Sequence, residues 1–161
     1  MHRSIVFLTL LLLSTAPFAT FAASPLLTVD DPYVRLAPPG AQTTGAFMLI
    51  KNSGSADCKL VKAESPVAKI VELHNHVNEN GVMKMRQVQS IDVKANGQAE
   101  LKPGGYHIML INMEKELKEG DVVPITLSCD DGSKTRIEAP VRKLQTTMPS
   151  KNMMDHGEMK H

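Results

Sequence analysis

Short runs of alternating apolar and polar residues fill most of the chain between residues 27 and 140, and turn residues separate them. Helical periodicity is almost absent, and the runs recur about every 8–12 residues, which is typical of an all-β sandwich or barrel. Turn-forming residues such as Pro38-Pro39-Gly40 and Asn80-Gly81 separate the runs. The predicted strands are 27–29 with 33–36, 43–51, 58–63, 68–76, 82–88, 98–101, 106–111, 122–128 and 134–140.

The two ends of the chain differ from this pattern. Residues 1–22 have a basic start at Arg3, an apolar run and small residues ending in Ala22-Ala23, which is the layout of a secretory signal peptide. The apolar run is shorter than the roughly 20 residues of a membrane-spanning helix. We expect cleavage near Ala22-Ala23, export to the periplasm and no later membrane span; the alternative is a retained N-terminal anchor. Residues 23–144 then form one domain, and residues 145–161 are predicted to be a flexible tail.

The net charge and the absence of catalytic motifs argue against several classes of function. The chain carries 18 Lys and Arg against 17 Asp and Glu, and loss of Arg3 with the signal leaves a formally neutral product. A formally neutral product has no excess of positive charge to suggest a nucleic acid or an anionic membrane surface, so we expect neither as a partner. No nucleophile–base set, phosphate loop or paired-carboxylate pattern stands out, so we do not expect an enzyme.

The chain has two cysteines, Cys58 and Cys129. Neither lies in a CxxC or CxxCH motif, which argues against thiol redox catalysis and covalent haem. In an oxidising compartment they either form one disulfide or stay as buried thiols, and the sequence leaves both possibilities open. Neither has a nearby histidine or methionine, so a blue-copper site, which needs a cysteine thiolate, is disfavoured.

Three predicted strands each carry two His or Met residues two positions apart, and residues so spaced share one face of a strand. Asn80-Gly81 predicts a two-residue type I′ turn, which would place His76 opposite Met85 and His74 diagonal to Met85. The three pairs are His74 with His76, Met83 with Met85, and His107 with Met109.

Thioethers and imidazoles without an anionic ligand are a donor set that suits Cu(I). The set lacks the carboxylates of calcium and magnesium sites and the thiolates of structural zinc sites. The spacing therefore indicates a soft-metal site on one face of the hairpin. Taken singly, each residue has an ordinary alternative, because methionine often fills cores and histidine often forms surface hydrogen bonds. On the other face of the third strand, Tyr106, Ile108 and Leu110 are expected in the core.

The order His74, ten residues, Met85, twenty-one residues, His107, one residue, Met109 resembles the H-x10-M-x21-H-x-M signature of the periplasmic copper chaperone PCuAC family. The resemblance covers roughly residues 30–130 and includes the segments TGAFM, VELH, GVMKMR, LKPGGYHIML and LKEGD. It implies a cupredoxin-like β-sandwich or Greek-key barrel that binds one Cu(I) through those four residues. It also implies delivery of copper to a cytochrome oxidase subunit or to its copper-assembly proteins.

The resemblance leaves some residues without an assigned role. His76 and Met83 become neighbours of the site, available as supporting residues or as alternate ligands, and Cys58 and Cys129 lie outside the signature. A periplasmic copper buffer or resistance protein without a dedicated acceptor would use the same ligands and is the alternative function.

The tail is rich in potential copper ligands. We interpret it as a second copper-binding segment, as in some members of the family, with histidines that suit Cu(II) and methionines that suit Cu(I). The alternative is an inert solubilising tail. The tail ligands are Met148, Met153, Met154, His156, Met159 and His161.

Overall fold

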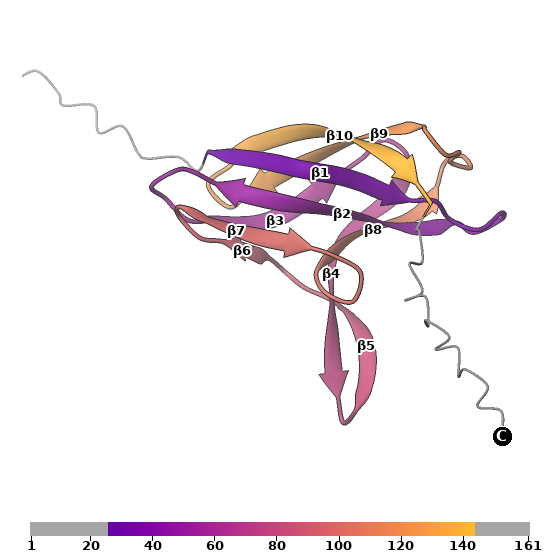
Figure 1. The fold of residues 1–161 in the computed structure, drawn as a ribbon, viewed down its shortest axis with the longest axis horizontal. Coiled ribbons are helices and arrows are strands. Elements are labelled where there is room, and N and C mark those ends of the chain that lie inside the picture. The colour runs from indigo at the N-terminus through magenta and orange to yellow at the C-terminus, as the bar shows by residue number, and fades with distance from the viewer. Residues whose placement is uncertain (1–25, 144–161) are drawn as a thin grey trace, which may run out of the picture.

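The computed structural model describes residues 26–143, and every regular element in this part of the chain is a β-strand (Figure 1). The all-β class predicted from the alternation is therefore confirmed. The strands are β1 (Leu27–Arg35), β2 (Thr43–Asn52), β3 (Cys58–Glu64), β4 (Ala68–Glu79), β5 (Val82–Gln87), β6 (Ile91–Val93), β7 (Gly97–Leu101), β8 (His107–Met113), β9 (Val122–Cys129) and β10 (Lys134–Arg142).

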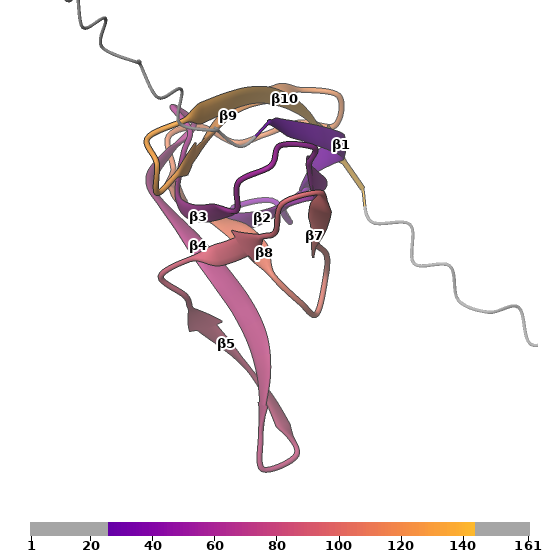
Figure 2. The ribbon, with the colours of Figure 1, turned by 90° about the vertical axis from the view of Figure 1, so that its left-hand side faces the viewer.

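The strands form two layers around a shared core. One layer has the order β5-β4-β8-β2-β1, with β7 also paired to β2, and the other has the order β10-β9-β3-β6. The layers meet where β1 runs parallel to β10, through Val34 opposite Val141. Figure 2 shows β9 and β10 on one side of the interior and β2, β7 and β8 on the other. Side chains such as Ile50, Leu60 and Ile125 are fully buried between them, so burial of the apolar face of each strand stabilises the sandwich.

Two strands differ from the prediction. β1 is continuous, although the pattern predicted two strands, because the break in alternation is an irregularity in the pairing with β2 between Asp30 and Tyr33. Asp31 there has a φ of 44°, which is how the extra residues are accommodated without ending the strand. The short strand β6 was not predicted, because its three residues are too few to show an alternating pattern.

Tyr106 corrects one expectation about the core. Ile108 and Leu110 are fully buried as predicted, but the Tyr106 side chain is 38% exposed. β8 begins at His107, and Tyr106 makes only an isolated bridge to Leu101. A residue outside the ladder is not bound by the alternation of the strand that follows it.

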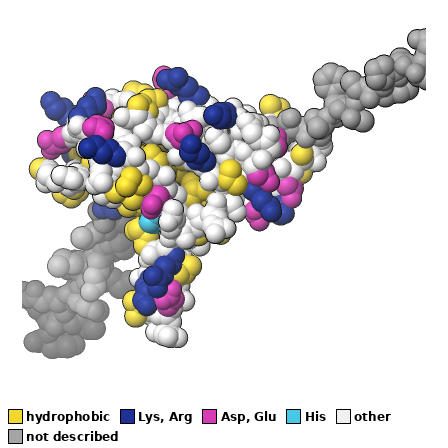
Figure 3. Space-filling model, turned by 180° about the vertical axis from the view of Figure 1, so that it is seen from behind, with side chains coloured by type: hydrophobic (Ala, Val, Ile, Leu, Met, Phe, Trp, Pro, Cys, Tyr) yellow, Lys and Arg dark blue, Asp and Glu magenta, His cyan; other side chains and the backbone are white. Residues whose placement is uncertain are grey.

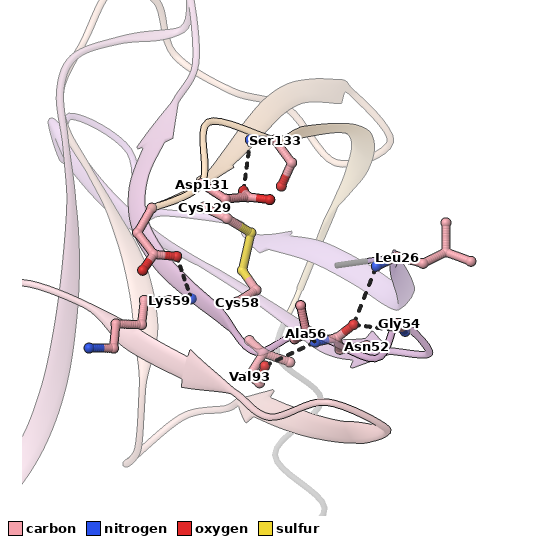
Figure 4. The surroundings of a disulfide bond; sticks show 11 residues. Leu26, Asn52, Gly54, Ala56, Cys58, Lys59, Val93, Cys129, Asp131 and Ser133 are labelled. Atoms are coloured by element: carbon pink, nitrogen blue, oxygen red, sulfur yellow. Dashed lines mark hydrogen bonds between the residues drawn. A yellow bond between two sulfur atoms is a disulfide. The ribbon is translucent and has the colours of Figure 1, made fainter. Parts of the chain in front are cut away.

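Cys58 and Cys129 are joined by a disulfide that connects β3 to β9, 71 residues apart in the chain (Figure 4). Beside it the buried Asn52 side chain ties three segments together. Its amide donates to the carbonyl oxygens of Ala56 and Val93, and its oxygen accepts the backbone N–H of Gly54. This end of the sandwich is therefore held by covalent and polar links as well as by the core.

The β4–β5 hairpin stands out from the body of the molecule (Figure 1). Every residue of β5 is exposed, and β5 is the terminal strand of its layer. Glu79 near the tip accepts hydrogen bonds from Lys84 and Arg86, and these bonds lower the pKa of Glu79 to about 2. Figure 3 shows this mixed group of charges on the projecting hairpin.

Within residues 26–143, no helix has the length and apolar character needed to cross a membrane.

Candidate metal site

The hairpin has the register that its turn predicts. Asn80 and Gly81 both have positive φ, at 55° and 83°, as a type I′ turn requires. Glu79 lies opposite Val82, which places His76 opposite Met85. His74 lies opposite Gln87 and is therefore diagonal to Met85. The predicted pairing of β4 with β5 is confirmed.

On its other edge β4 pairs with β8, and this pairing completes the site. His74 lies opposite His107, and Glu72 lies opposite Met109. Because directly opposed residues of antiparallel strands point to the same face, the three predicted pairs share one face of this layer. The structure thus brings together six residues from three strands: His74, His76, Met83, Met85, His107 and Met109.

A hollow of about 500 Å³ opens on this face. His76, Met85, His107 and Met109 line it, together with residues of β2 and of the loop after β1. His74 is not among the lining residues, although it is adjacent to His107 in the sheet. The hollow therefore places two imidazoles and two thioethers around one space.

His107 is the most deeply placed of the three histidines, with 2% of its surface exposed. Its Nδ1 is 2.9 Å from the carbonyl oxygen of Gly105, and because a carbonyl only accepts, Nδ1 carries the proton and donates. Nε2 is left with a free lone pair, the form in which imidazole binds metals. Burial lowers the pKa of His107, with smaller contributions from His76 and His74, while the Gly105 bond opposes the shift.

His74 is held by a neighbour that the sequence analysis did not single out. Its Nε2 is 2.8 Å from a carboxylate oxygen of Glu72, two residues earlier on the same face of β4. When Nε2 donates to that carboxylate, Nδ1 keeps its lone pair. A carboxylate behind an imidazole orients the ring and fixes its tautomer, as in many metal sites. The spacing Glu72-Leu73-His74 was the available signal, because it is a same-face pair like the others.

Unsatisfied ring nitrogens are the clearest chemical feature of the site. Among residues 26–143, four buried side-chain nitrogen or oxygen atoms have no hydrogen-bond partner. Three of them are Nδ1 of His74, Nδ1 of His76 and Nε2 of His107. The ring centroid of His107 is 5.8 Å from that of His74 and 5.2 Å from that of His76. A buried polar atom without a partner is costly, and a cation bound by these lone pairs would remove that cost.

The methionines determine which cation the site suits. Met83 and Met85 are 54% and 44% exposed, and Met109 is half-buried. Within the described residues, no three or more His, Cys, Asp or Glu side chains converge in a metal-holding geometry. Thioether sulfur is therefore needed to complete a coordination shell here. Neutral imidazole and thioether donors together favour Cu(I).

Gly45 and Phe47 of β2 close the inner side of the site. Gly45 lies opposite Met109, and a Cβ at this glycine would come within 3.0 Å of the Phe47 ring. The missing side chain lets that ring lie against His107, with centroids 6.1 Å apart. Both residues occur in the TGAFM segment, but their packing role depends on the pairing of β2 with β8, which the sequence does not show.

Comparison with known proteins places the chain in a family. Residues 27–141 match the family model described as lipoprotein LpqE-like. A protein of Leifsonia xyli subsp. xyli that is named as a lipoprotein, Lxx21020, is 36% identical over 115 residues, which cover 71% of this chain and 68% of that protein. The chain belongs to the LpqE-like family.

Two solved structures relate this LpqE-like chain to copper-binding domains. The Cu(I) form of DR1885 from Deinococcus radiodurans has a TM-score of 0.62 and 31% identity, and the match covers 79% of this chain and 85% of that one. The copper-bound PCuAC domain of PmoF2 also has a TM-score of 0.62, at 20% identity, over 76% of this chain and 97% of that one. The LpqE-like protein therefore has the β-sandwich fold of PCuAC copper-binding domains.

The predicted signal peptide and the predicted tail ligands lie outside the described residues of this LpqE-like protein. These tail residues are Met148, Met153, Met154, His156, Met159 and His161. The described chain ends just after β10, where the carbonyl oxygen of Arg142 accepts the N–H of Leu36 at 2.8 Å. Arg35 and Ala37, on either side of Leu36, line the hollow. Arg142, next to the last described residue, is therefore hydrogen-bonded to a segment whose neighbours line the hollow.

Proposed function

We propose that this protein is a copper chaperone that binds one Cu(I) through His74, Met85, His107 and Met109. The observation that carries the proposal is the group of buried imidazole nitrogens without partners, next to thioethers on the same sheet face. Copper-bound relatives of the same fold support the choice of metal. Copper is the cargo of such a protein, and the four neutral ligands leave it with a single positive charge.

The position of Met85 supports release as well as binding. A chaperone must exchange copper without freeing it, so an acceptor ligand has to approach while one resident ligand leaves. Met85 lies on an exposed terminal strand, whereas His107 is buried and held by Gly105. We infer that the thioether of Met85 leaves first and that His107 holds the ion until the acceptor has bound it.

The acceptor we propose is a cytochrome oxidase subunit or one of its copper-assembly proteins, met in the periplasm. Export through residues 1–22 would place the protein there, and the Cys58–Cys129 disulfide suits an oxidising compartment. A copper buffer without a dedicated acceptor would have the same site. Transfer from the loaded protein to a candidate oxidase subunit, faster than to a small chelator of equal affinity, supports the chaperone. Equal rates would favour the buffer.

Anaerobic competition titration against a chromophoric Cu(I) chelator tests the binding site. Met85 and Met83 are a matched pair, because both are exposed and point to the same face of β5. Met85→Leu should weaken binding by about tenfold or more, the scale of losing a metal-site contact, whereas Met83→Leu should leave it close to the parent. An equal effect of both substitutions, or of neither, would contradict the ligand assignment.

For the tail, we propose a second copper-binding segment that supplies the domain. The position of Arg142 beside a segment whose neighbours line the hollow supports this role, because a tethered ligand acts at a high effective concentration. Deletion of residues 145–161 should lower the Cu(II) stoichiometry of the full chain and slow loading of the Cu(I) site. Unchanged Cu(II) binding after the deletion would indicate an inert tail.

A further inference from the structure

We propose that His76 provides a second, outer copper position in the same hollow, formed with Met85 and His107 and used when copper enters and leaves. This inference rests on the proposed copper-binding function and concerns how the ion reaches its final ligands. His74 and His76 both point to the site face of β4, but they differ in pairing, anchoring and access to the hollow.

Pairing places His76 nearer to Met85. His76 lies directly opposite Met85, whereas His74 lies diagonal to it and opposite His107. Directly opposed residues have their Cβ atoms about 4.5–5.5 Å apart, and diagonal ones are farther apart. The His76 ring is also closer to the His107 ring than the His74 ring is, at 5.2 Å against 5.8 Å between centroids. Three donors thus surround an outer position without His74.

Anchoring distinguishes the two rings further. The Glu72 carboxylate holds His74 through Nε2, so this ring is fixed before copper binds. Nδ1 of His76 is buried and has no partner, and His76 lines the hollow that His74 does not. A ring that lines the hollow and that no hydrogen bond at Nδ1 holds in place is free to turn towards an incoming ion, which suits a first contact. A fixed ring suits a resident ligand, because less ordering is needed on binding.

The two positions share Met85 and His107, so copper can pass between them while it stays bound to both. As the ion moves inward, the bond to Nδ1 of His76 is exchanged for one to Nδ1 of His74, and the Met109 sulfur then adds as the fourth ligand. The ion stays Cu(I) throughout, and no proton is transferred when His76 is in the neutral tautomer with its proton on Nε2. Release reverses these steps while Met85, on the exposed hairpin, is replaced by the acceptor.

A double-mutant cycle in the full chain tests this arrangement by Cu(I) competition titration. With two positions available, His74→Ala should weaken binding by about tenfold or more but retain copper on His76, Met85 and His107. His74→Ala combined with His76→Ala should then lose the residual binding. Equal affinities of the single and the double variant would overturn the inference. If the parent chain itself binds no Cu(I), the proposed function fails instead.

Stopped-flow transfer to the same chelator tests the role in exchange. His76→Ala should leave the equilibrium affinity close to that of the parent and slow transfer by about tenfold or more. Gln87→Ala, an exposed change on the same face of β5, is the control and should alter neither quantity. Unchanged transfer in His76→Ala would overturn the inference. A loss of affinity as large as that of His107→Ala would also overturn it, because His76 would then be a resident ligand.

Discussion

His74 and His107 lie directly opposite each other on β4 and β8, with ring centroids 5.8 Å apart and one buried, unpartnered nitrogen on each ring. Glu72 fixes one ring from behind, and the Gly105 carbonyl fixes the other. The site is therefore prepared on its inner side before copper arrives, while its outer side on β5 is exposed. This asymmetry between a fixed inner side and an open outer side determines the predictions below.

Protonation should compete with copper through the histidines, because thioethers do not titrate. Cu(I) affinity should fall as the pH drops below the ordinary histidine value of about 6.5. Burial lowers the pKa of His107, so this ligand should resist protons to lower pH than a free imidazole. Competition titrations at several pH values test this. Constant affinity between neutral pH and about pH 5, well below the ordinary histidine value, would contradict histidine ligation.

The same shift predicts a pH dependence of folding in the copper-free protein. Because the folded pKa of His107 lies below the unfolded one, the unfolded chain binds more protons in this range. The contribution of His107 to the free energy of unfolding is therefore fully present above about pH 6.5. It is lost as the pH falls through the lowered pKa of the folded state. Thermal unfolding should show this loss in the parent and a weaker one in His107→Leu. Parallel curves for the two proteins would contradict it.

Glu72→Gln should weaken Cu(I) binding without altering the fold. The amide keeps the size of the side chain but removes the charge that holds the His74 ring in place. The expected loss is about tenfold, the lower end of what removal of such a supporting carboxylate causes. Glu100→Gln, at an exposed carboxylate on β7, is a suitable control. Identical affinities for the Glu72 variant and the control would show that the hydrogen bond between Glu72 and His74 has no part in binding.

Removal of the disulfide should lower the free energy of unfolding but leave the Cu(I) affinity of the folded protein unchanged. Cys58→Ser with Cys129→Ser opens a link across 71 residues, which should cost about 4 kcal/mol of unfolding free energy by loop-closure entropy. The bond joins β3 to β9, in the layer that does not carry the site. Chemical denaturation measures the first effect and Cu(I) titration below the unfolding transition measures the second. A large loss of affinity in the folded double variant would show that the two regions are coupled.

Local patterns in the sequence predicted much of the candidate site. Alternation places His74 with His76 and His107 with Met109, and Asn80-Gly81 sets the hairpin register. These are properties of one strand or one turn. The missing parts depend on pairing between distant segments. Phe47 lies against His107 only because β2 pairs with β8. Glu72 supports the site only because the pairing of β4 with β8 brings its neighbour His74 to His107.

The fold shows the same division between local and distant information. Strand positions followed from the pattern, but β6 was too short to detect and Tyr106 falls outside its expected ladder. The contrast between His74 and His76 was also hidden, because both share a face of β4. They differ in their partners on the adjacent strands and in the bond from His74 to Glu72.

X-ray absorption at the copper edge of the Cu(I)-loaded full chain tests the central claim most directly. The account predicts a mixed shell of imidazole nitrogen and thioether sulfur, with loss of nitrogen scattering in His107→Ala and of sulfur scattering in Met85→Leu. A shell without sulfur, or one that neither substitution changes, would contradict binding of copper by this face of the β4–β5 hairpin and β8.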